Sequence, residues 1–66
     1  MNKSEKRECA KLDMLARMVP RQIGIDTLAR SYSALIRSAM TQKSKNEIIT
    51  VAAAIPAVVQ HPDFII

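Results

Sequence analysis

The segment from Ile48 to Val59 is almost wholly apolar, and it constrains the fold more than any other part of the chain. Thr50 and Pro56 interrupt it. The segment is too short to cross a bilayer, because a spanning helix needs about 20 apolar residues. A helix that is hydrophobic on every side has to be buried on every side. The rest of the chain, or a second molecule, must therefore cover this segment.

The residues around this segment favour a helix that begins near Ser44. Ser44 and Glu47 have the spacing of a capping box directly before the apolar run. The β-branched residues at 48–51 would also fit a strand, but the alanines at 52–54 and the cap favour a helix. Pro56 removes a backbone donor and clashes with the preceding turn. It predicts either a kink or a helix that ends near Ile55 and restarts.

A first helix is expected from about Lys3 to Met18. Asn2 and Glu5 have the spacing of a capping box, and Ser4 is an alternative cap. Pro20 should end the helix, because the residue before a proline is disfavoured in the helical region. The expected core stripe follows helical spacing. It consists of Cys9, Leu12, Leu15, Ala16 and Val19.

A second helix is expected to begin at Asp26, its predicted N-cap, and to stop near Thr41. Gly24 lies in the turn expected over residues 20–25. One face carries apolar residues at three-four spacing, which is typical of a helix with one buried side. That face consists of Ile25, Leu28, Ala29, Tyr32, Leu35, Ile36, Ala39 and Met40, and the opposite face carries Arg30, Ser31, Ser33, Arg37 and Ser38.

Three helices in a single domain over residues 1–66 predict a small all-α protein, with the third helix kinked at Pro56. A core in a chain below about 70 residues rarely supplies more than about 5 kcal/mol, and oligomerisation is one remedy. We therefore expect a helical homodimer, unless the same apolar surface binds a different protein. The predicted interface consists of Leu35, Ile48, Val51, Ile55, Val58, Val59, Phe64 and Ile65.

The charge is concentrated in the first two-thirds of the chain. Ten Lys and Arg face six Asp and Glu, for a net charge of +4, while residues 46–66 contain no Lys or Arg. Such a basic face can attract an acidic protein or the phosphates of DNA, or can simply be solvated. The candidate contacts are Lys3, Arg7, Lys11, Arg30 and Arg37. A helix-turn-helix is only weakly indicated, because neither expected link is a short turn of three or four residues.

Catalysis is not expected. His61, the single histidine, has Asp63 two residues on, but it lies at an expected helix end, where a cap or a solvated side chain is more common than a catalytic base. Cys9, the single cysteine, lies on an apolar stripe, and only Lys6 and Lys11 nearby could lower its pKa. The one glycine excludes a glycine-rich phosphate loop. The acidic residues show no metal-ligand spacing. We expect no catalytic residue, metal, cofactor or small-molecule substrate.

These patterns predict a small non-enzymatic regulatory protein, such as an inhibitor, anti-activator or adaptor, that binds another protein as a helical homodimer. The alternative is a small dimeric DNA-binding transcriptional regulator. Met14, Met18 and Met40 fit either core filling, the more frequent role, or an adaptable binding surface. The N-terminal segment lacks the apolar region of a signal peptide, and a single free Cys9 fits a reducing compartment. We therefore expect a cytoplasmic protein with no membrane contact.

Overall fold

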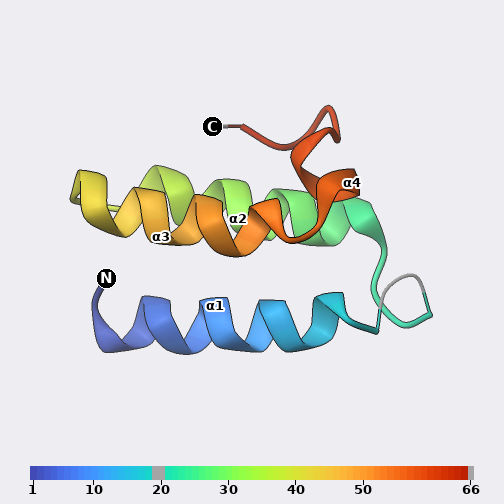
Figure 1. Cartoon of the computed structure of the whole chain (residues 1–66), viewed down its shortest axis with the longest axis horizontal. Helices are drawn as coiled ribbons and strands as arrows, with labels where there is room; N and C mark the ends of the chain where they lie inside the picture. The colour runs from blue at the N-terminus through green and yellow to red at the C-terminus, as the bar shows by residue number, and fades with distance from the viewer. Residues whose placement is uncertain (19–20, 66) are drawn as a thin grey trace.

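The apolar third of the chain forms two helices rather than one, as seen in the computed structural model, which describes residues 1–18 and 21–65 (Figure 1). Helix α3 spans Gln42–Ala53, and helix α4 begins again at Pro56 and ends at Val59. Proline is well tolerated at the first position of a helix, where its missing N–H would have no partner. The predicted interruption at Pro56 is therefore confirmed, and the described residues contain helices and no strand.

Helix α1 spans Lys3–Ala16, and its predicted cap is confirmed. The Asn2 side chain accepts a hydrogen bond from the Glu5 backbone N–H at 2.7 Å. This bond satisfies one of the four N–H groups that have no partner at the start of a helix. The helix ends two residues before Met18. The stop expected at Pro20, and the stripe position at Val19, lie outside the described residues.

Helix α2 spans Ile25–Ser38, and its N-cap lies two residues earlier than predicted. Gly24 is its N-cap, so the assignment of Asp26 to that position is wrong. Asp26 instead lies in the first turn, where its negative charge interacts favourably with the helix dipole. The apolar face largely forms as predicted, with Leu28, Ala29, Tyr32 and Ile36 buried.

The predicted start of the third helix at Ser44 is also wrong. Thr41 caps α3, and its hydroxyl oxygen accepts from the Ser44 backbone N–H at 3.1 Å. Ser44 is buried inside the first turn. Only the three residues between Ser38 and Gln42 therefore separate α2 from α3, so the second helix stops before Thr41 and the expected long polar link is absent.

The helices form two layers around one core. Helices α2 and α3 run antiparallel and pack side by side, and α1 lies along both of them (Figure 1). Helix α4 packs on α2 and α3, and the C-terminal segment then runs back over them on the side away from α1. The buried apolar core consists of Cys9, Leu28, Ala29, Tyr32, Ile36, Ile48, Ala52, Val58 and Phe64.

Candidate functional site

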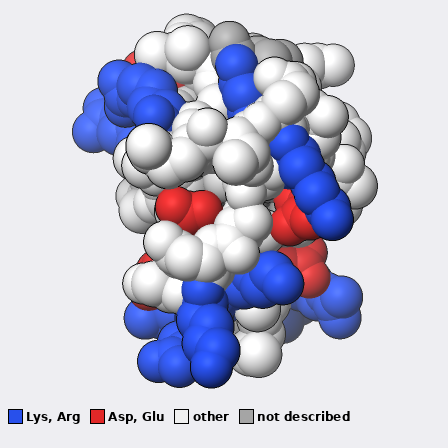
Figure 2. Space-filling view, turned by 90° about the vertical axis from the view of Figure 1, so that its left-hand side faces the viewer, with Lys and Arg blue, Asp and Glu red and all other residues white. Residues whose placement is uncertain are grey.

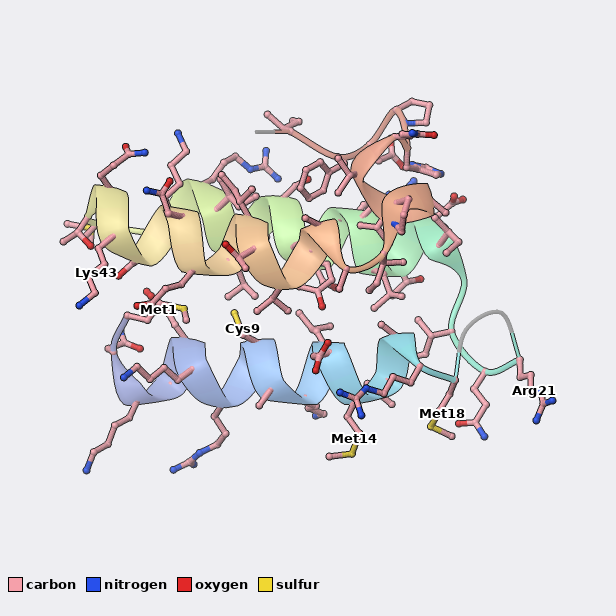
Figure 3. All side chains as sticks on the ribbon, viewed as in Figure 1. Met1, Cys9, Met14, Met18, Arg21 and Lys43 are labelled. Atoms are coloured by element: carbon pink, nitrogen blue, oxygen red, sulfur yellow. The ribbon has the colours of Figure 1, made fainter. Side chains whose placement is uncertain are left out.

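A row of cations follows the exposed side of α1. Lys3, Arg7 and Lys11 recur every four residues, which places them on one side of a helix. All three are exposed, and none makes an ion pair with another described residue. Cys9, on the opposite side of the helix, points toward α3 (Figure 3). Figure 2, a view of the end that holds the start of α1, shows Lys and Arg side chains gathered along its lower edge.

Two methionines continue this row beyond Lys11. Met14 is 66% exposed and Met18, just after the helix, is 38% exposed. Both point away from the other helices (Figure 3). The residues of α1 that pack on the core are instead Cys9, Leu12 and Ala16. We call the surface formed by Lys3, Arg7, Lys11, Met14 and Met18 the outward face of α1.

The exposed positions of these methionines do not fit core filling, the more frequent of the two roles that the sequence leaves open for them. Met40, in the turn between α2 and α3, is 91% exposed. The short turn between these helices explains this exposure, because α2 ends at Ser38 and the apolar stripe of α2 does not continue to Met40. The structure therefore places Met14, Met18 and Met40 on the surface of the fold.

The residues of the predicted interface are divided by the fold. Ile48 and Val58 have 0% exposure, and Phe64 is also buried in the chain's own core. A partner cannot contact Ile48 or Val58 in this fold. The others remain accessible to different extents, with Leu35, Val51, Ile55 and Val59 half-buried and Ile65 exposed.

Arg30 and Arg37 do not join the cations of α1. Arg30 forms an ion pair with Asp63 of the C-terminal segment, with 3.0 Å between Nε and Oδ2. This segment lies on the side of α2 and α3 away from α1 (Figure 1). Arg37, two turns further along α2, is exposed. The structure therefore separates the predicted basic residues into two sets, one along α1 and the other on α2.

Polar contacts hold the C-terminal segment on α2, and the sequence analysis did not foresee them. The buried hydroxyl of Ser33 donates to the Asp63 carbonyl at 3.0 Å and accepts from the Ile65 N–H at 2.8 Å. His61 places Nε2 against the Asp26 carboxylate, and its Nδ1 accepts from the Asp63 N–H at 3.1 Å. Ser33 had been assigned to the solvated side of its helix. It is buried because the returning segment covers it.

The two buried titratable side chains of the core lie between α1 and the other helices. Burial raises the pKa of the Cys9 thiol, and Glu5, Glu47 and Glu8 raise it further. A thiol with a raised pKa is a poor nucleophile. The Cys9 sulfur lies 3.7 Å from that of Met1 (Figure 3). Cys9 belongs to the buried core, and Met1 packs against that core.

Tyr32 carries a hydroxyl that is buried without a hydrogen-bond partner among the described residues. Burial raises its pKa to about 12, and Asp13 and Cys9 add to the shift. Leaving a buried polar group without a partner costs about 1–3 kcal/mol. Tyr32→Phe removes the group and keeps the ring, so we expect a gain of about 1 kcal/mol in unfolding free energy, measured by urea denaturation at pH 7.

The same tyrosine gives a pH dependence with a defined sign. Its pKa rises from 10.0, the ordinary value, to about 12 on folding, so its contribution to stability is complete below pH 10 and is lost as the pH approaches 12. Tyr32→Phe should remove that part of the alkaline loss. Equal losses between pH 10 and 12 in both proteins would contradict the assignment.

Other kinds of site were sought in the described part of the chain. No group of three or more His, Cys, Asp or Glu side chains there could hold a metal ion. None of its helices has the length and apolar character needed to cross a membrane. Comparison of the chain with protein-family models, curated proteins and solved structures finds no match. The function proposed below therefore rests on the side chains at the surface of the fold.

Proposed function

We propose that the chain is a small non-enzymatic regulator, of the inhibitor, anti-activator or adaptor type, that acts by binding another protein as a helical homodimer. The exposure of large apolar side chains supports this proposal most directly. Met14, Met18 and Met40 are exposed, as is Ile65 at 51%. Methionine is common on surfaces that adapt to a protein partner. The proposal includes the cytoplasmic location expected for the single thiol of Cys9.

The accessible part of the predicted interface supports the homodimer. Four residues of the predicted interface keep exposed apolar surface. They are Val51 of α3, Ile55 between α3 and α4, Val59 of α4 and Ile65 of the C-terminal segment. A two-fold dimer would bury these patches against the same patches of the second copy. The buried residues Ile48 and Val58 then stabilise each subunit rather than the interface.

A charge at Ile65 tests this homodimer. Ile65→Asp should raise the dimer dissociation constant at least about tenfold, because it places a carboxylate in an apolar contact. Sedimentation velocity over a range of protein concentrations measures this constant. Gln60→Asp is the matched control, because Gln60 is exposed in the same segment and outside the predicted interface. A monomeric wild type, or equal effects of the two substitutions, would remove the homodimer from the proposal.

The alternative is a DNA-binding regulator. The row Lys3, Arg7 and Lys11, which makes no ion pair among the described residues, favours it. Cations at this spacing can contact successive phosphates. The antiparallel packing of α2 and α3 does not support a helix-turn-helix, whose helices cross at about 90–120° (Figure 1). Anisotropy of a random DNA duplex at about 50 and 200 mM salt separates the two functions, because binding through phosphates weakens steeply with salt.

A further inference from the structure

We propose that the outward face of α1 binds an acidic amphipathic helix of another protein. This inference rests on the protein-binding function proposed above and specifies its surface and its partner. The face combines two chemistries along one helix. Cations occupy its N-terminal part, and Met14 and Met18 occupy its C-terminal end.

Charge complementarity indicates an acidic partner. The first three turns of α1 carry cations that make no ion pair in the described part of the chain. Glu5 is half-buried and Glu8 is exposed, so this part of the helix keeps an excess of positive charge, contributed by Lys3, Lys6, Arg7 and Lys11. Opposite charge across an interface speeds association and fixes its register.

The C-terminal end of the outward face, formed by Met14 and Met18, indicates that the partner carries apolar anchor residues. Met14 and Met18 are unbranched and polarizable, so they can pack against side chains of irregular shape. Ala10 is exposed one turn before Met14 and allows a neighbouring helix to approach closely. Helix α1 has 14 residues and is about 21 Å long, which a partner helix of equal length would match.

A helix fits this face better than an extended strand or a second copy. Helix α1 has no free backbone edge to which a strand could add, whereas its rows of side chains can pack into the grooves of another helix. A second copy of the face would bring its three cations against the same three cations, with Glu8 as the single exposed carboxylate beside them. The occupant is therefore a different protein that carries carboxylates next to apolar anchors.

The probe for this surface is a fluorescent synthetic peptide of about 14 residues, with Glu along one half and Leu at helical spacing along the other. Its anisotropy is titrated with the full chain, and a scrambled peptide of equal composition is the control. We expect Met14→Glu to weaken binding of the designed peptide at least about tenfold. Gln60→Glu adds the same carboxylate at an exposed residue at the end of α4, outside the outward face and the predicted interface, and should leave binding unchanged.

The cations are tested in the same way. Lys11→Glu should weaken peptide binding and reduce its dependence on salt, since it removes one attractive charge and adds a repulsive one. Arg37→Glu makes a similar charge change at an exposed residue of α2, outside the proposed face, and should have the smaller effect on peptide binding. Equal effects of Lys11→Glu and Arg37→Glu, or of Met14→Glu and Gln60→Glu, would overturn the proposal. So would equal binding of the scrambled peptide.

Two further measurements separate this inference from the proposed function. If the wild type binds a random DNA duplex but not the designed peptide, and Lys11→Glu abolishes that binding, the face is a nucleic-acid surface and the inference is wrong. A photo-crosslinking side chain is also placed at position 14 or 65 of the full chain in cells. A crosslink to a different protein from position 65, with none from position 14, would overturn the inference and leave the proposed function standing. Capture from neither position would overturn both.

Discussion

Replacing Ile48 with alanine should lower the free energy of unfolding by about 2–5 kcal/mol. Ile48 lies on α3 with 0% exposure, inside the cluster that joins α3 to α2 and α1. Removing its methyl and methylene groups loses their burial and leaves a cavity that packed neighbours fill only in part. Because native proteins of this size are marginally stable, such a loss should unfold a large fraction of the chain.

Urea denaturation followed by circular dichroism measures this loss, with Ile65→Ala as control. Ile65 is 51% exposed, so its truncation should cost less than about 1 kcal/mol in the monomer. The concentration dependence is as informative as the size of the effect. If Ile48 stabilises the subunit, its effect is the same at every protein concentration. An effect of Ile48→Ala that appears only at concentrations where the chain is dimeric would place this residue at the interface instead.

The elements that could be predicted from the sequence are those set by neighbouring residues. Asn2 caps α1 through a residue three positions away, and Pro56 separates α3 from α4 by its own ring geometry. The wrong boundaries arise where two local signals compete. Thr41 and Ser44 both carry a hydroxyl that can cap a helix, and the earlier of the two is the N-cap of α3. Gly24 caps α2 although it has no side chain, in place of Asp26.

The candidate site could be predicted only in part, because burial depends on residues far apart in the chain. Ser33 is buried by contacts with residues 30 and 32 positions away, and no spacing within α2 indicates this. The shared position of Lys3, Arg7 and Lys11 could be predicted, because the spacing within one helix puts them on the same side. Met14 lies on the same side of that helix, and helical spacing could have placed it there before the structure was known.

The apolar segment at 48–59 is covered in part by the chain's own C-terminal residues, which the sequence did not indicate. The sequence predicts a kink or a restart at Pro56, but the remaining apolar surface, Phe64 included, is assigned there to a second molecule. The break at Pro56 instead lets α4 pack on α2 and α3, and the segment after it brings Phe64 into the core. The chain thus buries Ile48 and Val58 by itself, and a partner has less apolar surface to cover than the sequence suggested.

Replacing Ser33 with alanine should cost about 1–3 kcal/mol, because it leaves two backbone groups of the C-terminal segment without their partner. These groups are the Asp63 carbonyl and the Ile65 N–H. Urea denaturation measures the loss, and the exchange of the Ile65 amide hydrogen should accelerate. Ser38→Ala is the control, because its exposed hydroxyl bonds only within α2 and its loss should change stability by less than about 0.5 kcal/mol.

The strongest test of the C-terminal segment as one unit combines Ser33→Ala with Phe64→Ala. Phe64 is buried, and its truncation alone should cost about 3 kcal/mol. If Ser33 and Phe64 hold the same segment, detaching it removes both contacts at once, so the double variant should lose less than the sum of the two single losses. A sum that holds within about 0.5 kcal/mol would mean that the two residues act independently. In that case Phe64 would remain in the core after the Ser33 hydrogen bonds are lost, and residues 60–65 would not move as a unit.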